Sequence, residues 1–105
     1  MDQALVVLVT ASSVDEARQI AQGLLDSRLA ACVNVVPVES LFRWEGAIQH
    51  EAEALMIIKT RAGAFDRLAQ AIKAAHSYDV PEIIALPIAA GSAEYLKWIE
   101  DEVTP

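Results

Sequence analysis

Cysteine is almost absent from this 105-residue sequence, and its scarcity excludes several classes of protein. The single cysteine, Cys32, cannot build a disulfide framework, an iron–sulfur cluster held by one chain, or a Cys-X-X-Cys metal-transfer motif. The four glycines are too scattered to form a phosphate-binding loop. Basic residues are also few, since 8 Lys and Arg against 15 Asp and Glu give a formal net charge of −7. Such an acidic field disfavours nucleic acid and anionic membranes as partners.

Long apolar runs are missing as well. No run approaches the roughly 20 residues of a membrane-spanning helix, and Met1-Asp2-Gln3 lacks the positive flank of a signal peptide. Hydrophobic residues nevertheless make up 54% of the chain, which is enough for one packed core. We therefore expect a soluble, reduced, cytoplasmic protein that folds as a single domain over residues 1–105.

Hydrophobic periodicity divides the chain into strands and helices. Ser13 and Glu16 have the spacing of a capping box at a helix start, and Glu45-Gly46 has the composition of a hairpin turn. Pro37 and Pro87 restrict their strands to sheet edges or bulges. The predicted strands are 4–10, 31–44, 47–60 and 82–89, and the predicted helices are 14–28, 64–76 and 93–102.

This order, β-α-β-β-α-β with a C-terminal helix, predicts an α+β fold, the ferredoxin-like sandwich of a four-stranded antiparallel sheet with two helices on one face. The two middle strands exceed the usual length of about 5–6 residues, so their hairpin should protrude beyond the helices. A protruding apolar ribbon and an uncovered sheet face both favour self-association.

Three side chains are candidates for metal chemistry. Cys32 is expected to be a small buried residue, with a soft ligand for Cu(I) as the alternative. His50 lies in the charged half of the hairpin and should face solvent or a second subunit, because Glu51 and Glu53 point to the other side of the strand. His76 is expected at the end of a helix, where it is either a cap that favours the helix dipole or a ligand for a divalent ion.

Other polar and aromatic residues suggest a pocket. Lys59, Tyr78 and Glu82 stand at the ends of apolar strands, either as solvent-facing residues or as the polar groups of a small-molecule site. Trp44 and Trp98 are expected to anchor the core or an interface. With two histidines and no nucleophile elbow, hydrolytic triad chemistry is disfavoured, and we expect no enzymatic activity.

Together these residues resemble the CutA divalent-cation tolerance family. The resemblance runs from about Leu5 to Ile99, and it is carried by the motifs VLVTA, LAACVN, WEG, IIKT, YDVPEIIALPI and EYLKWI. Positions that keep the family pattern are Trp44, Glu45, Gly46, Lys59, Thr60, His76, Tyr78, Pro81, Glu82, Tyr95 and Trp98.

The resemblance implies a stable homotrimer in which long strands pair between subunits, as in PII-like signalling proteins. It also implies tolerance of copper and other divalent cations. Of the ligands suggested for some members, only His76 is present, because Val9 and Ala75 occupy the other positions and Ser77 replaces the usual proline.

We therefore expect a homotrimer that has no tightly bound cofactor and binds Cu(II) or another divalent ion weakly to moderately through His76. Trp44, Glu45, Lys59, Tyr78, Glu82 and Trp98 are candidates for a pocket between subunits. A PII-like sensor of a small molecule and a ligand-free structural trimer remain as alternatives.

Overall fold

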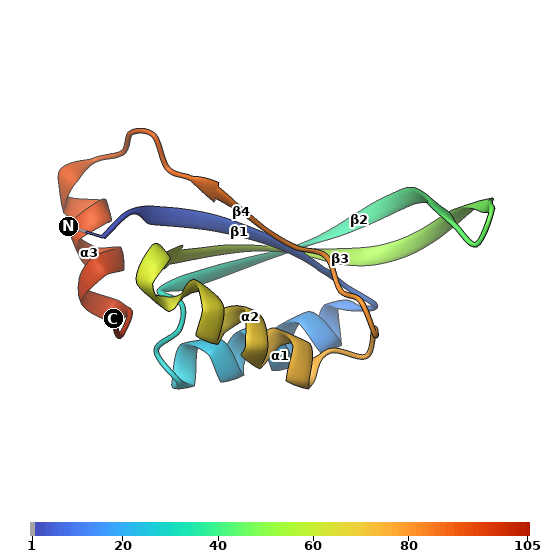
Figure 1. Cartoon of the computed structure of the whole chain (residues 1–105), viewed down its shortest axis with the longest axis horizontal. Coiled ribbons are helices and arrows are strands. Elements are labelled where there is room, and N and C mark those ends of the chain that lie inside the picture. Colours follow the sequence, from blue (N-terminus) through green and yellow to red (C-terminus); the bar gives the residue numbers. More distant parts are fainter. Residues whose placement is uncertain (1) are drawn as a thin grey trace.

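The protein is an antiparallel sheet with two helices packed on one face (Figure 1). The computed structural model describes residues 2–105. In chain order its elements are β1 (Ala4–Ala11), α1 (Val14–Asp26), β2 (Cys32–Trp44), β3 (Ala47–Arg61), a 3-10 turn η1 (Ala62–Ala64), α2 (Phe65–Ala75), β4 (Ile83–Pro87) and α3 (Ala93–Glu102). The strand order β2-β3-β1-β4 is that of the predicted ferredoxin-like sandwich, so this prediction is confirmed.

The helix starts follow the expected capping chemistry. The Oγ of Ser13 accepts a hydrogen bond from the N–H of Glu16 at 3.0 Å, and Ser92 caps α3 in the same way through the N–H of Tyr95. The second half of the predicted capping box differs, because the carboxylate of Glu16 turns to Ser12 instead of to the N–H of Ser13. The second carboxylate oxygen of Glu16 is then available to accept a hydrogen bond from Ser77, 61 residues further along the chain.

The core lies between the sheet and the two covering helices. Side chains that alternate along β1 and β3 pack against the inner faces of α1 and α2, and each of them is at most 4% exposed. These residues are Val7, Val9, Met56, Ile58, Ile20, Leu24, Leu68 and Ile72. The alternation of strands and the 3.6-residue period of helices explain why the sequence indicated these elements.

The hairpin of β2 and β3 projects well beyond the helices, as Figure 1 shows. Its strands stay in regular register to the tip, where Trp44 pairs with Ala47. Glu45 and Gly46 have φ values of 50° and 78°, the left-handed conformations of a two-residue type I′ turn. Because β2 is an edge strand, Pro37 is accommodated without a bulge.

The opposite face of the sheet carries a group of apolar side chains and is covered by neither α1 nor α2. Along this face, exposed Ile84 and Leu86 of β4 stand beside half-buried Leu8 and Val6 of β1. Exposed Val36 of β2 continues the surface on the other side. We call this surface the open face.

Several predictions need correction. Residues 82–89 form only the five-residue strand β4, because β1 offers it partners from Leu5 to Val9 and no further. Of the two roles expected for Trp44 and Trp98, the core is excluded, since they are 55% and 40% exposed, and an interface stays a prediction. Cys32 is half-buried instead of buried, because its position in β2 places it on the open face, opposite Lys59. Between residues 2 and 105 no helix is long and apolar enough to cross a membrane.

Candidate functional site

A wide groove lies between the hairpin and the segment that joins α2 to β4. Its volume is about 900 Å³, and its walls come from β2, β3, the end of β1 and residues 78–82. Leu41, Phe42 and Trp44 give it an apolar and aromatic side. Most of the hairpin residues that line it share a face with Glu53, which alternates with the buried Ala54 and therefore lies on the side of the sheet opposite α1 and α2.

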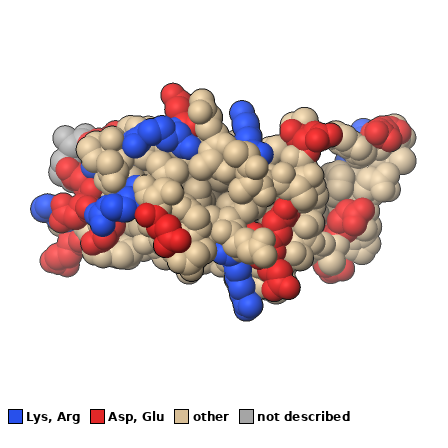
Figure 2. Space-filling view, turned by 90° about the horizontal axis from the view of Figure 1, so that it is seen from below, with Lys and Arg blue, Asp and Glu red and all other residues tan. Residues whose placement is uncertain are grey.

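Carboxylates dominate the polar lining of this groove. Five of them contribute: Glu39, Glu51, Glu53, Asp79 and Glu82. None of the described residues that line the groove is a lysine or an arginine. Figure 2 shows acidic groups along the hairpin half of the molecule, seen from the helix side. The groove therefore favours cations electrostatically.

Tyr78 joins one wall of the groove to the other. Its hydroxyl donates a hydrogen bond of 2.6 Å to Oε2 of Glu53 on β3. Burial of the ring, together with this hydrogen bond and the charge of Glu53, raises the pKa of the Tyr78 phenol above its ordinary value. Tyr78 therefore stays protonated and acts as a donor at any physiological pH.

His76 caps the end of α2 and packs beside Tyr78, with their ring centroids 4.7 Å apart. Its Nε2 lies 2.8 Å from the carbonyl oxygen of Thr10, and its Nδ1 lies 3.0 Å from the backbone nitrogen of Tyr78. Both ring nitrogens therefore have partners within the chain.

The carboxylate of Glu16 binds Ser77, which lies between His76 and Tyr78. Its Oε2 accepts the N–H of Ser77 at 2.8 Å, while its Oε1 accepts both the N–H and the hydroxyl of Ser12 at 2.9 Å. Partial burial works to raise the pKa of Glu16, but the hydrogen bonds from Ser12 and Ser77 outweigh it and lower the pKa to about 2. Residues 76–78 are thus bonded to β1, α1 and β3 in turn.

The structure brings together only some of the residues predicted for a pocket. Trp44, Tyr78 and Glu82 line the groove. Glu45 is at the hairpin tip, and neither Lys59 nor Trp98 is among the residues lining the groove.

Lys59 and Trp98 have other surroundings. The Nζ of Lys59 donates to Oδ1 of Asn34 on the neighbouring strand. Trp98 stacks against Tyr95 on the surface of α3, with ring centroids 5.5 Å apart. The predicted pocket residues are therefore divided between the groove and the opposite end of the sheet.

One ion pair was missed by the sequence reasoning. Nε2 of His50 lies 3.1 Å from Oε1 of Glu39, which is on β2 and not on the strand of His50. The register pairs His50 with Leu41, and Glu39 is two residues further along the same face. The two-residue turn at Glu45-Gly46 was the signal that could have predicted this pair, because it fixes that register.

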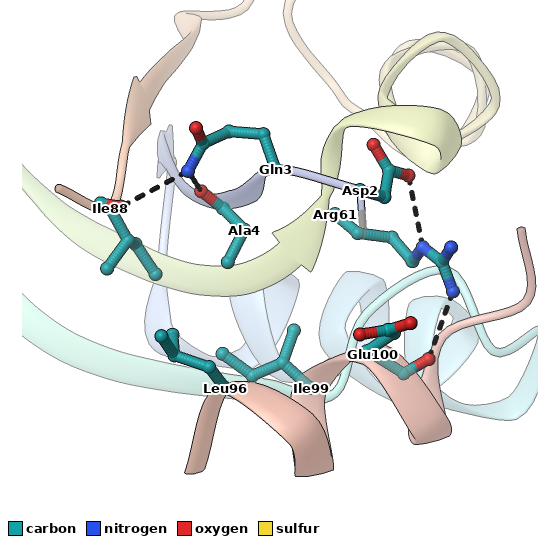
Figure 3. A pocket seen from close by; sticks show the side chains of 8 residues that line it. All are labelled: Asp2, Gln3, Ala4, Arg61, Ile88, Leu96, Ile99 and Glu100. Atoms are coloured by element: carbon teal, nitrogen blue, oxygen red, sulfur yellow. Dashed lines mark hydrogen bonds and ion pairs between the residues drawn. The ribbon is translucent and has the colours of Figure 1, made fainter. Parts of the chain in front are cut away.

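A second, smaller cavity of about 200 Å³ lies between the start of β1 and α3 (Figure 3). Arg61 crosses it, with Nε 3.1 Å from Oδ2 of Asp2 and Nη1 donating to the carbonyl oxygen of Glu100 at 3.1 Å. Gln3 donates to the carbonyl oxygen of Ile88. These bonds join Asp2 to Arg61, Arg61 to α3 and Gln3 to the residue after β4, which is a structural role.

The described residues do not form a ready metal centre. Residues 2–105 contain no group of three or more His, Cys, Asp or Glu side chains placed to hold one ion. The groove carboxylates are spread along its length, and His76 is already hydrogen-bonded through both nitrogens. Oxygen and imidazole donors of the right type for a divalent ion are present but not convergent.

The fold and the groove define the class of protein: a small ferredoxin-like domain with a sheet face that α1 and α2 leave uncovered and an acidic groove. Within that class the chain belongs to the CutA1 divalent ion tolerance protein family, whose sequence model matches residues 5–102.

The relatives agree in sequence and in structure. The divalent-cation tolerance protein CutA of Thermus thermophilus is 50% identical over 97 residues, which are 91% of this chain and 94% of that protein. Protein CutA 1, chloroplastic, of rice is 47% identical over 92% of this chain, which spans 55% of the rice protein. The structure described as the periplasmic divalent cation tolerance protein CutA of Archaeoglobus fulgidus matches with a TM-score of 0.94 and 44% identity, covering 96% of this chain and 99% of that one.

Proposed function

We propose that this chain supports tolerance of divalent cations as a self-associating single-domain subunit that binds these ions weakly, copper foremost, through His76 and nearby oxygens. The observation that carries the proposal is family membership over nearly the whole chain, combined with an acidic groove beside His76. Neither catalysis nor a tightly bound cofactor is part of the proposal, since the family is named for ion tolerance.

Weak binding is the expected strength for two reasons. One imidazole gives low affinity by itself, and the described residues bring no group of three ligating side chains to one point. Breaking a hydrogen bond of His76 also costs about 1 kcal/mol. Stronger binding would require ligands from neighbouring subunits, which a homotrimer can supply at its three equivalent interfaces.

Self-association is supported by the open face and by the hairpin. Ile84 and Leu86 are about half exposed, and Leu41 and Ile48 near the hairpin tip are more exposed still. Ile84 and Leu86 share the open face, whereas Leu41 and Ile48 lie on the other face of the hairpin, and each group favours a contact with another molecule. We propose the trimer that the family resemblance implies, and the cytoplasm as its location. Because relatives are described as chloroplastic or periplasmic, fractionation of the source cells tests the location directly.

The test of metal binding is a calorimetric titration of the metal-free protein with Cu(II). His76→Ala should weaken the binding at least about tenfold, which corresponds to the loss of one good ligand. His50→Ala is the matched control, because His50 is the other histidine and lies on the exposed hairpin. Equal affinity of wild type and His76→Ala would remove His76 from the proposal.

The groove also supports a second candidate function, the binding of a small molecule. Five carboxylates and an aromatic side, with no lysine or arginine among the described lining residues, select a cationic ligand. A panel of organic cations should then raise the melting temperature, and Glu82→Gln should reduce that rise. Lys59→Ala serves as the control, because Lys59 does not line the groove. No shift across the panel would favour a structural trimer without a ligand.

A further inference from the structure

One carboxylate oxygen on α3 is buried without a hydrogen-bond partner in the part of the chain that the structure describes. This atom is Oε2 of Glu100, and no donor of residues 2–105 reaches it. Buried acceptors are normally hydrogen-bonded, and a charged one left unpaired is costly, so this oxygen points to a donor from outside the chain. Glu100 lines the cavity of about 200 Å³ between the start of β1 and α3 (Figure 3).

Two neighbouring cations are already bonded to other groups. Arg61 lines the same cavity, but its Nε lies 3.1 Å from Oδ2 of Asp2, and its Nη1 donates to the backbone carbonyl oxygen of Glu100. Lys97 precedes Glu100 by one turn of α3, and its Nζ lies 2.8 Å from Oδ1 of Asp101. None of the ion pairs between residues 2 and 105 includes Glu100. Within the described chain, the charge of this carboxylate therefore has no direct counter-ion.

The lining of the cavity restricts what could supply the donor. Leu96 and Ile99 lie beside Glu100 on the α3 side, and Ala4 and Ile88 lie across the cavity from them (Figure 3). A metal ion is a poor match, because the described residues offer no group of three His, Cys, Asp or Glu side chains placed to hold one. The apolar walls instead favour a hydrocarbon chain next to the carboxylate. The cavity is larger than the roughly 10–15 Å³ that one water needs, yet it limits a ligand to a few heavy atoms.

We propose that this cavity binds a small primary alkylammonium ion, whose N–H groups donate to Oε2 of Glu100 and whose short chain packs against Leu96 and Ile99. The uncompensated charge selects a cation, and the unpaired oxygen selects a hydrogen-bond donor. The apolar walls select an alkyl chain over a hydrated inorganic ion. The site is independent of the proposed function, because the cavity shares no lining residue with the groove and does not include His76.

The test is an amide-resolved NMR titration with n-butylammonium chloride at neutral pH. Saturable shifts are expected at Ala4, Leu96 and Ile99, with a dissociation constant of about 1–10 mM, since a ligand of about five heavy atoms makes few contacts. Tetramethylammonium and n-butanol are the comparison probes, because the first has the charge without an N–H and the second has the chain without the charge. Each should bind at least about tenfold more weakly than n-butylammonium.

Glu100→Gln tests the role of the carboxylate. The substitution keeps the shape of the side chain but removes its charge, so it should weaken the binding of n-butylammonium at least about tenfold. Glu94→Gln is the matched control, because Glu94 is an exposed glutamate of the same helix and does not line the cavity. The affinity of this control should equal that of wild type. The same NMR spectra report whether both variants are folded.

The outcomes separate a specific site from general attraction to an acidic protein. Loss of binding in Glu100→Gln alone supports the proposal. Equal affinity of the two variants, or shifts that rise without saturation, would overturn it. If Glu100→Gln does not fold, the probes decide in wild type, where equal affinity for n-butylammonium and tetramethylammonium overturns the proposal. A cavity that takes up only water gives no saturable shift with any probe, and this result overturns it as well.

Discussion

Single hydrogen bonds determine where the polar side chains of this protein lie. Thr60 is fully buried among apolar residues of β3, and its hydroxyl donates to the carbonyl oxygen of Leu29 at 2.7 Å. Glu16 is half-buried and accepts three hydrogen bonds, from Ser12 and Ser77. Both side chains connect segments that are distant in the sequence, so their loss should affect tertiary structure more than local structure.

Ionisation of Glu16 should make the free energy of unfolding depend on pH in the acidic range. Because its pKa in the folded protein is about 2, against 4.5 ordinarily, the ionised form stabilises the fold. That contribution is complete above about pH 4.5 and is lost as the pH falls towards 2. Glu16→Gln should lower the free energy of unfolding by about 2 kcal/mol at pH 7. Urea denaturation between pH 7 and pH 2.5 should show the difference from wild type shrinking as the pH falls. Glu51→Gln on the exposed hairpin is the control, and a difference constant with pH would contradict the assignment.

Thr60 allows a test of a buried hydroxyl. Thr60→Val keeps the shape of the side chain but leaves the carbonyl of Leu29 without its donor, so we expect a loss of about 1–3 kcal/mol. Thr60→Ser keeps the hydroxyl and should cost less. Urea unfolding measures both. A valine variant as stable as wild type would show that water replaces the donor.

At the scale of elements, the hairpin depends on its turn. Both turn residues have positive φ, and an added Cβ at Gly46 would meet nothing within 4 Å. The requirement for glycine there is therefore conformational and not steric.

Substitutions at the two turn residues should change the stability of the hairpin tip in opposite directions. Gly46→Ala should weaken the turn by about 1 kcal/mol, because alanine resists the left-handed region. Glu45→Asn should strengthen it, since Asn-Gly is the preferred type I′ pair. Amide exchange at Trp44 and Ala47 is the suitable measurement, because the tip can open without unfolding the core. Faster amide exchange in Glu45→Asn than in wild type would contradict the view that the turn determines the stability of the hairpin tip.

The elements could be predicted because each has a regular period. A continuous apolar run identified β1, the capping serines Ser13 and Ser92 identified the starts of α1 and α3, and the turn at Glu45-Gly46 identified the start of β3. The site was harder, because it depends on contacts between elements. Tyr78 and Glu53 are 25 residues apart and meet only through the course of a loop.

Within one chain, Lys59 lies away from the groove because of the length of β3. Glu53 and Lys59 share a face of β3, but six residues of strand separate them by about 20 Å. They cannot act on one small ligand in the same subunit. The sequence identified the chemical types of the groove residues but could not place them along the strand.

At the scale of the whole molecule, the open face is the main apolar surface that the helices α1 and α2 leave exposed to water. Sheet faces without a covering layer are stable in water when a second molecule covers them. Ile84, which is 51% exposed on β4, lies within this surface, while Leu25, 40% exposed, lies on the helix side.

A charge on the open face should therefore prevent assembly without preventing folding. Sedimentation velocity should find wild type as a trimer and Ile84→Lys as a smaller species with an unchanged circular dichroism spectrum. Leu25→Lys should remain assembled. A monomeric wild type would overturn the proposal of self-association, and an assembled Ile84→Lys would move the interface elsewhere.

The central position of β1 also affects synthesis on the ribosome. This strand precedes both of its neighbours in the sequence, since β3 is complete at Arg61 and β4 at Pro87. While the nascent chain grows, the hairpin can pair with β1 before β4 is made, but the outer side of β1 stays uncovered until β4 has emerged. Since unpaired strand edges promote aggregation, the vulnerable interval lasts until β4 is available. A chain interrupted before β4 would keep an exposed edge along the strand at the centre of its sheet.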